Sequence, residues 1–572
     1  MLNYREKISE VIAEVVPEMR AEEILPLIEV PQDTKMGDYA FPCFRLARVM
    51  RKSPKDIAAD IASKVENINV IDKIEAVNAY VNIFLSKAAM AESTLQSVLA
   101  NKELEKGNKG RGKTVVIDFS SPNIAKAFHI GHIRSTVIGN SIYKIYDHQG
   151  YNVIRSNHLG DYGTQFGKMI VAYRRWGSEA EVEADPINVL LSYYTRFHVE
   201  REDDPTLDDD ARKAFYDLEH GDEEATRLWK WFSDLSLREF DRVYKLLGIE
   251  FDVYDGESFY SDMLQGQIDD LKKKGLLTKS EGANVVDLSD VDLPPVLITK
   301  SDGSSLYCTR DLATAVYRKK HFDFYRNLYV VGSQQILYFK QVFSVLKKMG
   351  YEWADDCVHI PFGMVSLEEG TMSTRYGRVV FLEDVLLKAI EKTKDIIKEK
   401  NPDAEDSFID SVAREVGIGA VVFQELSNNK IKDYTFSWNK VLNFEGETGP
   451  YVQYTHARCA SVMRKAGEDI CKIAENIDFD SSYLDGDRIY ELIKLIHRLP
   501  DVMEEAGEKY EPSIITRHII DLAQAYNRFY HDERILTDDK NEMTAKVAVT
   551  MATKKAIAVG LEMLGVKAPE RM

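Results

Sequence analysis

TVVIDFSSPNIAKAFHIGHIRSTVIGN, residues 114–140, begins as an apolar strand and ends inside a helix. The run TVVIDF (114–119) has the nearly unbroken apolar character of a strand that is covered on both faces. A polar loop follows it, and the helix predicted from about His129 to His148 stops at Gly150. A second strand, NVIRS (152–156), comes directly afterwards. Strand, helix and strand in this order predict a βαβ unit within a parallel sheet.

The loop between the first strand and its helix is the predicted ligand site. Open parallel sheets bind ligands at the carboxyl ends of their strands, and a helix amino terminus offers unpaired N–H groups to a phosphate. His129 and His132 are three residues apart on the first turn, so both can face one phosphate. Gly131 lets a flat base approach the backbone, and Lys126 adds a positive charge before the helix. Two histidines alone are usually ordinary helix residues, but their place after a buried strand indicates a nucleotide site.

Working outward, the chain divides into six expected segments. Residues 1–108 form an N-terminal α/β unit, which the charged, glycine-rich stretch NKELEKGNKGRGK (101–113) links to the parallel-sheet domain. We expect the first half of that domain over 109–177, a helical insertion over 178–285 and the second half over 286–384. The α/β pattern is expected to resume in this second half with VVDLSD, PVLITK, a helix over 310–320 and the strand NLYVVG (327–332). A helical connector (385–445) and a helix bundle (446–572) complete the chain.

The composition is that of a soluble globular protein. The 572 residues are 44% hydrophobic and 29% charged, and no apolar run reaches the roughly 18 residues of a membrane span. The N-terminal MLNYREKISEVIAEVV predicts an amphipathic helix rather than a signal peptide. The five cysteines are scattered and have no zinc-ligand spacing, which fits a reduced cytoplasmic compartment, and no membrane partner is expected. The net charge of −19 neither requires nor excludes a nucleic-acid partner, because a local basic track can exist on an acidic protein.

The segment 120–140 resembles the HIGH motif of class I aminoacyl-tRNA synthetases. This resemblance implies a second phosphate-binding loop later in the chain, and TMSTR (371–375) occupies the place of the family's KMSKS loop. Met372, Ser373 and Arg375 are then expected to bind ATP, although Thr371 replaces the usual first lysine. A phosphate needs a compensating charge rather than a fixed position, so Lys126 can supply it and Arg375 can add a bidentate contact. We therefore expect activity despite the altered loop.

A second group of residues points to arginine as the amino acid. A guanidinium group is planar and always charged, and it is best held by carboxylates beside an aromatic face. Tyr307 and Asp311 are four residues apart at the start of a helix and can hold it together. With NHLGDYGTQFG (157–167), this set resembles the arginyl-tRNA synthetase family. The residues that the resemblance assigns to the arginine pocket are Asp118, Ser120, Asn123, His158, Tyr307, Asp311 and Gln335, with Glu257 as a second guanidinium carboxylate.

The resemblance extends over nearly the whole chain. It implies a fold with a Rossmann-type catalytic domain, an N-terminal α/β domain that contacts the tRNA elbow, and a C-terminal all-helical anticodon-binding bundle. Aromatic side chains stack on splayed RNA bases, although tyrosines at helical spacing are more often core residues. The residues expected to contact tRNA are Tyr80, Asn82, Tyr451, Tyr454, Tyr526, Tyr530 and Met572.

The implied reaction joins L-arginine to tRNA(Arg) through an arginyl-adenylate. It uses ATP with Mg²⁺, no protein-bound zinc is expected, and we expect a monomer. Three alternatives stay open at this point: a class I synthetase for another amino acid, such as cysteine or glutamine; a nucleotidyltransferase with a similar histidine loop; and a catalytically silent tRNA-binding paralogue. The absent zinc ligands and the Tyr307–Asp311 pair disfavour the first, chain length disfavours the second, and the intact histidines disfavour the third.

Overall fold

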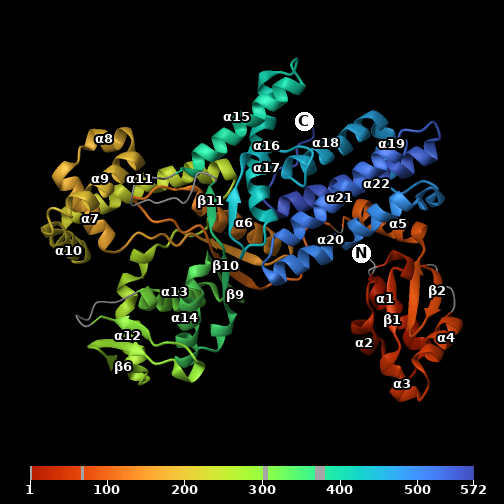
Figure 1. Ribbon diagram of the computed structural model, residues 1–572, viewed down its shortest axis with the longest axis horizontal. Coiled ribbons are helices and arrows are strands. Elements are labelled where there is room, and N and C mark those ends of the chain that lie inside the picture. The colour runs from red at the N-terminus through yellow and green to blue at the C-terminus, as the bar shows by residue number, and fades with distance from the viewer. Residues whose placement is uncertain (1–2, 32, 66–69, 103, 301–306, 368–379) are drawn as a thin grey trace.

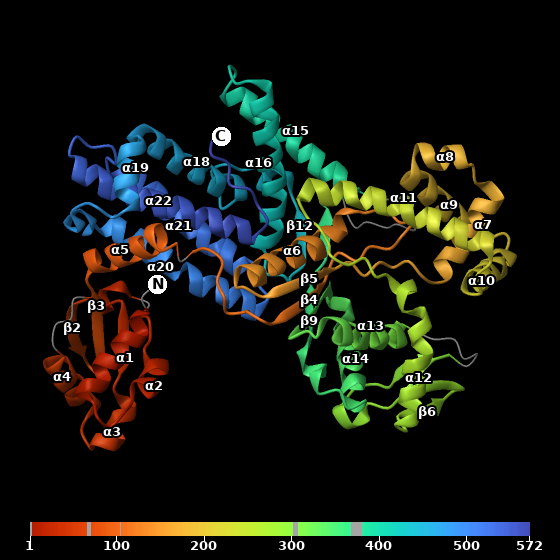
Figure 2. The ribbon, with the colours of Figure 1, turned by 180° about the vertical axis from the view of Figure 1, so that it is seen from behind.

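A computed structural model describes residues 3–31, 33–65, 70–102, 104–300, 307–367 and 380–572 (Figures 1 and 2). Its centre is a four-stranded parallel sheet in the order β10-β9-β4-β5. The strands are β4 (Thr114–Asp118), β5 (Asn152–Ser156), β9 (Arg326–Gly332) and β10 (Cys357–Phe362). Helix α6 (Ile133–His148) joins β4 to β5, and α14 (Ile336–Lys348) joins β9 to β10. The predicted βαβ unit is thus confirmed.

Both faces of this sheet are covered, which explains why β4 is almost entirely apolar. Val115 and Ile117 pack on the side of α6, whereas Val116 packs with α13 (Tyr307–Phe322) and α14 on the other side. All three valine and isoleucine side chains are fully buried. The carboxyl ends of β9, β4 and β5 therefore form one accessible edge between two helical layers, where the chain places its polar loops.

The strands near 285–299 differ from the prediction. We expected VVDLSD and PVLITK to continue the main α/β pattern, but they form a separate antiparallel sheet in the order β6-β7-β8. The strands are β6 (Leu277–Ser280), β7 (Ala283–Val286) and β8 (Val296–Thr299). Glu281 and Gly282 both have positive φ, which makes the two-residue hairpin turn that joins β6 to β7. The connection from β7 to β8 is also too short for a parallel crossover, which needs about a dozen residues.

Most of the segment expected as an insertion, 178–285, is helical, with α8 (Glu179–Ala184), α9 (Pro186–Glu200), α10 (Thr206–Glu219), α11 (Glu223–Leu247) and α12 (Leu264–Lys273), but it also holds β6. Helix α7 (Thr164–Trp176) precedes it and stands with α8, α9 and α10 at one end of the molecule, whereas α12 lies beside β6 (Figure 1). The 25-residue α11 runs back to the central sheet, where Tyr244 is fully buried against the loop after β4. Helix α11 therefore packs against the predicted ligand loop through Tyr244.

The N-terminal unit is a small α/β structure beneath the C-terminal helices (Figure 2). Its antiparallel sheet has the order β1-β3-β2, with β1 (Tyr39–Pro42), β2 (Ile71–Val77) and β3 (Tyr80–Leu85). Its helices are α1 (Tyr4–Val15), α2 (Ala21–Ile24), α3 (Phe44–Met50) and α4 (Pro54–Lys64), and α5 (Lys87–Leu95) leads out of it. Lys494 pairs with Asp38 at 3.3 Å and Thr94 lies 3.3 Å from His497, so this unit is attached to a C-terminal helix.

The C-terminal part is helical, as predicted. Its helices are α15 (Leu382–Lys400), α16 (Asp406–Ser427), α17 (Trp438–Val441), α18 (Gly449–Ala466), α19 (Glu468–Glu475), α20 (Asp487–Lys509), α21 (Ser513–Asp532) and α22 (Lys540–Met563). A short parallel pair, β11 (Val365–Leu367) and β12 (Tyr434–Phe436), ties it to the catalytic region.

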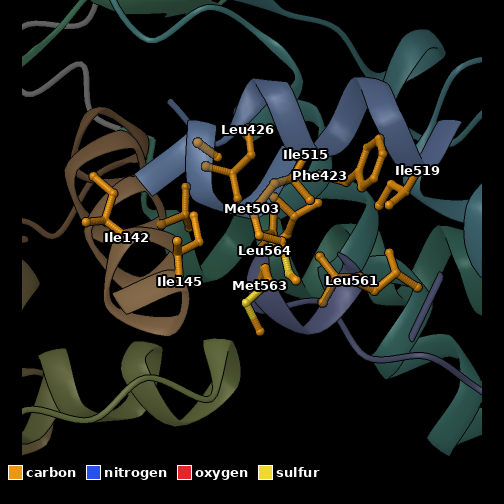
Figure 3. Close-up of a cluster of buried hydrophobic side chains, with 14 of the residues drawn as sticks. Ile142, Ile145, Phe423, Leu426, Met503, Ile515, Ile519, Leu561, Met563 and Leu564 are labelled. Carbon is orange, nitrogen blue, oxygen red and sulfur yellow. The ribbon is translucent and has the colours of Figure 1, made fainter. Parts of the chain in front are cut away.

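Helix α6 is shared between the sheet and this bundle (Figure 3). Its outer side packs into an apolar cluster made of Ile142, Ile145, Phe423, Leu426, Met503, Ile515, Ile519, Leu561, Met563 and Leu564. Ser141 donates a hydrogen bond of 2.8 Å to the Met563 carbonyl, at the end of α22. Among the described residues, no helix is both long and apolar enough to cross a membrane.

Candidate active site

The loop after β4 has an unusual backbone. Ser120, Ser121 and Ala125 all have positive φ, between 45° and 69°, a region that non-glycine residues rarely adopt. Such conformations persist only where surrounding contacts hold them. Ser120 supplies one such contact, because its hydroxyl lies 2.8 Å from both Tyr244 Oη and Thr136 Oγ1. Ser120, expected in the arginine pocket, is therefore buried under the loop, and its hydroxyl contacts hold the loop backbone in place.

The two histidines lie side by side at the start of α6, with ring centroids 4.0 Å apart. Gly131 N–H donates to His129 Nδ1 (3.0 Å), so the neutral His129 ring carries its proton on Nε2. Burial lowers the pKa of His132 to about 3, and burial with the nearby Lys126 charge lowers the pKa of His129. Both rings are therefore neutral at pH 7. His129 can donate a hydrogen bond to a phosphate oxygen, and the fixed positive charge nearby belongs to Lys126.

The segment that returns from the expected second loop lies against these histidines. Ile130 N–H donates to the Val380 carbonyl (3.1 Å), and Leu382 N–H donates to the Phe128 carbonyl (3.0 Å). Residues 380–382 are thus hydrogen-bonded to the histidine segment. The predicted ATP-binding residues Met372, Ser373 and Arg375 lie outside the described residues.

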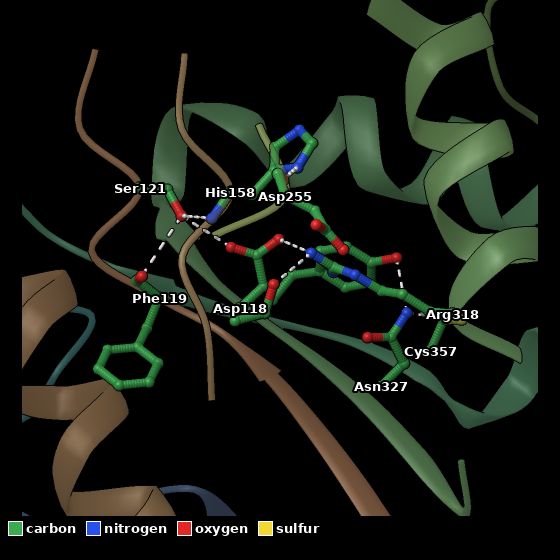
Figure 4. Close-up of polar contacts among 10 residues, drawn as sticks. Asp118, Phe119, Ser121, His158, Asp255, Arg318, Asn327 and Cys357 are labelled. Atoms are coloured by element: carbon green, nitrogen blue, oxygen red, sulfur yellow. Dashed lines mark hydrogen bonds and ion pairs between the residues drawn. The ribbon is translucent and has the colours of Figure 1, made fainter. Parts of the chain in front are cut away.

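Asp118 lies at the carboxyl end of β4 within a buried polar cluster (Figure 4). Arg318 Nη2 donates to Asp118 Oδ2 (2.8 Å), and Ser121 Oγ donates to Asp118 Oδ1 (2.7 Å). The His158 backbone N–H donates in turn to Ser121 Oγ (3.2 Å), and the His158 ring Nδ1 lies 3.0 Å from the Asp255 carbonyl. The ends of β4 and β5 and helix α13 are thereby joined around one carboxylate.

Asp311 lies on the same helix as Arg318, two turns earlier. Its carboxylate accepts a short hydrogen bond from the Tyr338 hydroxyl of α14. Burial raises the pKa of Asp311, because the charged form is poorly solvated there. A ligand cation would offset that cost. Tyr307, one turn before Asp311, is 64% exposed and is therefore free to lie over a ligand.

Asn123 and Gln335 are exposed at the same sheet edge. Gln335 follows β9 in the short helix η7 (Ser333–Gln335), and Asn123 follows β4. Gly160 lies directly beneath Asn123, since a Cβ at Gly160 would stand 2.2 Å from Asn123 Oδ1. The carboxyl ends of three neighbouring strands thus bring Asp118, His158 and Gln335 to one edge, as the sheet geometry predicted.

Glu257, expected as a second guanidinium carboxylate, already has a partner in the protein. Arg310 Nη1 donates to Glu257 Oε2 (2.8 Å), and both side chains are largely buried. Burial raises the pKa of Glu257 to about 7, although the Arg310 charge opposes that rise. The Arg310 guanidinium also lies 5.2 Å from the Tyr307 ring centroid. Glu257 thus contacts Arg310, which in turn lies beside Tyr307.

The helical bundle carries a hollow of about 990 Å³. Its lining includes Tyr454, Tyr530 and Met572, three of the residues expected to contact tRNA, and six cations: Lys400, Arg458, Arg464, Lys465, Arg534 and Arg571. The Arg458 guanidinium lies 4.9 Å from the ring centroids of both Tyr454 and Tyr530, which are 43% and 41% exposed. Exposed aromatic rings beside positive charges are suited to single-stranded RNA.

Other residues expected to contact tRNA are placed differently. The expectation for Tyr526 is wrong, because its ring is fully buried between helices of the bundle and offers no face to a base. Tyr451 is half-buried and its hydroxyl accepts a hydrogen bond from Asn527 (2.9 Å). In the N-terminal unit, Tyr80 is half-buried against Phe44, and Asn82 is buried within β3.

Comparisons with known proteins agree along the whole chain. The family model of the catalytic domain of class I (R) tRNA synthetases matches residues 94–438. The models of the arginyl tRNA synthetase N-terminal domain and of the DALR anticodon binding domain match residues 2–85 and 452–572. The arginine–tRNA ligases of Clostridioides difficile and Halothermothrix orenii are 54% and 52% identical over 573 residues, with 100% of each chain covered.

Solved structures share the fold. The arginyl-tRNA synthetase of Thermus thermophilus superposes with a TM-score of 0.81 at 24% identity, covering 100% of both chains. That of Plasmodium falciparum gives the same TM-score and identity and covers 100% of this chain and 99% of its own. With three family models along its length and relatives of more than 50% identity, the chain belongs to the arginine–tRNA ligases, a family of class I aminoacyl-tRNA synthetases.

Proposed function

We propose a division of labour for the reaction of this family at the sheet edge. The carboxylate of L-arginine attacks the α-phosphate of ATP, giving arginyl-adenylate and pyrophosphate. The arginyl group then passes to the 3′-terminal adenosine of tRNA(Arg). The observation that carries this assignment is the placement of two different sets of groups at neighbouring strand ends: the paired rings of His129 and His132 on one side, and the hydrogen-bonded carboxylates of Asp118 and Asp311 on the other.

At the ATP end, His129 donates from Nε2 to a phosphate oxygen and Lys126 supplies positive charge. Neutral donors that are already oriented stabilise developing charge without reorganising during the reaction. Met372, Ser373 and Arg375 also bind ATP in this proposal, as the family resemblance implies, and residues 380–382 further along the chain are hydrogen-bonded to the histidine segment. Mg²⁺ bound with ATP would supply further positive charge to the phosphates, beside Lys126.

At the arginine end, Asp311 receives the substrate guanidinium and Tyr307 covers it. Asp311 suits this role because its partly buried carboxylate has one neutral partner, Tyr338, and no cation bonded to it among the described residues. Asn123 and Gln335 bind the α-amino and carboxylate groups, because both are exposed beside the phosphate site. Glu257 acts indirectly by holding Arg310 beside Tyr307.

The tRNA lies along the helical side of the molecule. Bases of the anticodon loop occupy the hollow between α18 and α21, stacked on Tyr454 and Tyr530 and next to Met572. Tyr80 of the N-terminal unit contacts the tRNA elbow. We further propose a cytoplasmic monomer whose adenylate step needs bound tRNA. ATP–pyrophosphate exchange at full rate without tRNA would refute that last point.

Charging of bulk tRNA with each labelled amino acid tests the assignment, with Asp311→Asn as the key variant. We expect the wild type to charge arginine alone. Losing a buried charged contact costs about 2–5 kcal/mol, so kcat/KM for arginine should fall about 30- to 5000-fold in Asp311→Asn. Asp323→Asn, just beyond the same helix and 90% exposed, should charge normally. Charging with another amino acid, or full activity of Asp311→Asn, would overturn the assignment.

A further inference from the structure

Arg318 is a fully buried cation bonded to Asp118, one of the residues expected in the arginine pocket. It lies on α13 seven residues after Asp311, which is two helical turns and therefore the same face. Only 1% of its side chain is exposed. Its Nη2 donates to Asp118 Oδ2 (2.8 Å) and to Ser156 Oγ (3.0 Å), so it joins the ends of β4 and β5 (Figure 4).

The guanidinium is also fixed from its other side. It lies 5.5 Å from the Tyr329 ring centroid, and Tyr329 in β9 is hydrogen-bonded by Asn327 (2.7 Å). Three strands and one helix thus hold Arg318 in one place. Because Arg318 is held in one place, it also fixes the position of the group that it binds, the Asp118 carboxylate.

Asp118 is held at both oxygens. Arg318 binds Oδ2, and Ser121 from the strained loop binds Oδ1 at 2.7 Å. The carboxylate therefore has a single orientation, and it stands where the loop, β5 and α13 meet. Without Arg318, one oxygen would lose its donor, and Asp118 would be a buried charge without a bonded cation.

The charges around Arg318 do not balance. Asp118, Asp255 and Asp311 all interact electrostatically with this one guanidinium. His158 also faces Asp255 and Asp311. Among the described residues, Arg318 is the arginine bonded to this cluster, and one guanidinium among three carboxylates leaves an excess of negative charge at the strand ends. Arginine brings two cationic groups, its guanidinium and its α-ammonium, and both are suited to such an excess.

We propose that Arg318 is a positioning residue for arginine binding: it fixes the Asp118 carboxylate and neutralises only part of the acidic cluster, so that the cationic groups of the amino acid complete it. This inference rests on the proposed function. Arg318 does not touch the substrate. Its effect reaches the substrate through Asp118.

Steady-state aminoacylation of Arg318→Met and Arg318→Lys tests the inference, with the KM values for arginine and ATP measured separately. We expect Arg318→Met to raise KM for arginine at least tenfold and to change KM for ATP less than about twofold. Arg318→Lys should recover part of the loss, because an ammonium group restores the charge but cannot reproduce the planar fork. Arg326→Met is the matched control, since Arg326 pairs with Asp356 (2.7 Å) at the opposite end of the sheet.

The double variant Arg318→Met/Asp118→Asn separates positioning from folding. Removing both charges should restore the thermal unfolding midpoint that Arg318→Met lowers, because no unpaired buried charge is left. KM for arginine should stay high in the double variant. An unchanged arginine KM in folded Arg318→Met, or recovery of KM along with stability in the double variant, would overturn the inference. A wild type that does not charge arginine would instead refute the proposed function itself.

Discussion

Gly139→Ala should disable the ATP site although it adds only one methyl group. Gly139 lies inside α6, where the helix packs on the end of β4. An added Cβ would stand 2.2 Å from both Cβ and Cγ of Phe119 and 2.5 Å from its Cδ2. Phe119 is fully buried and packs against Phe251, with ring centroids 4.6 Å apart, so it has little room to turn away.

The size of the effect follows from that distance. Ordinary contact begins near 3.4 Å, so α6 and β4 must separate by about 1.2 Å at this point. Overpacking of this kind costs about 1–3 kcal/mol, which exceeds the 0.5–1 kcal/mol that alanine gains over glycine in a helix. His129 and His132 stand at the start of α6 and move with it. A shift of about 1 Å in a positioned catalytic group costs about a hundredfold in rate.

Steady-state aminoacylation at varied ATP concentration measures the effect. We expect kcat/KM for ATP to fall about 10- to 100-fold and the unfolding midpoint to fall with it. Gly266→Ala is the matched control, since Gly266 lies on the exposed side of α12 with no atom within 4 Å of the added Cβ. That variant should keep full activity and be slightly more stable. If Gly139→Ala retained wild-type kcat/KM, the packing of α6 on β4 would not be what positions the histidines.

Two further predictions concern the histidines and the tRNA hollow. Burial lowers the pKa of His132 in the folded protein to about 3, so between pH 6.5 and pH 3 the unfolded chain binds more protons than the folded one. The free energy of unfolding should therefore fall as pH drops through that window, by about 1–2 kcal/mol at pH 5. His132→Gln should lose this part of the dependence in thermal unfolding at stepped pH, and an identical pH profile would contradict the burial argument. Tyr454→Ala should raise KM for tRNA about 5- to 150-fold, since base stacking contributes about 1–3 kcal/mol. Tyr325→Ala, which removes a partly exposed ring beneath Lys113, should leave that KM unchanged, and equal effects of both variants would refute a stacking role.

The sequence predicted the sheet edge well because its signals are local. An apolar run, a polar loop and a helix stop define the unit around β4, and the fixed geometry of parallel strands then places Asp118, His158 and Gln335 at one edge. The strands near 285–299 were placed in the wrong sheet, because their periodicity is the same in either sheet. The turn at Glu281 and Gly282 carried the distinguishing signal.

Burial of polar groups was the part that the sequence did not predict. Arg318, Arg310 and Tyr338 were all missed, since a charged or hydroxyl group in a helix is usually at the surface. The seven-residue spacing from Asp311 to Arg318 was the available signal. The prediction for Tyr526 was wrong for the opposite reason. Its helical spacing fits an exposed ring and a core ring equally well, and only the packing between helices determines which of the two it is.

Helix α6 also limits how this enzyme can change over evolution. Its first turn follows the histidines expected to bind ATP, and its outer side packs against α20 and α22, where Ser141 donates its hydrogen bond to the Met563 carbonyl. A C-terminal bundle taken from a distant relative would meet this helix with mismatched side chains. We expect such a replacement to fold only where the residues of this apolar cluster are exchanged together. The helix expected to carry the ATP site and the helices expected to meet tRNA are therefore packed as one unit.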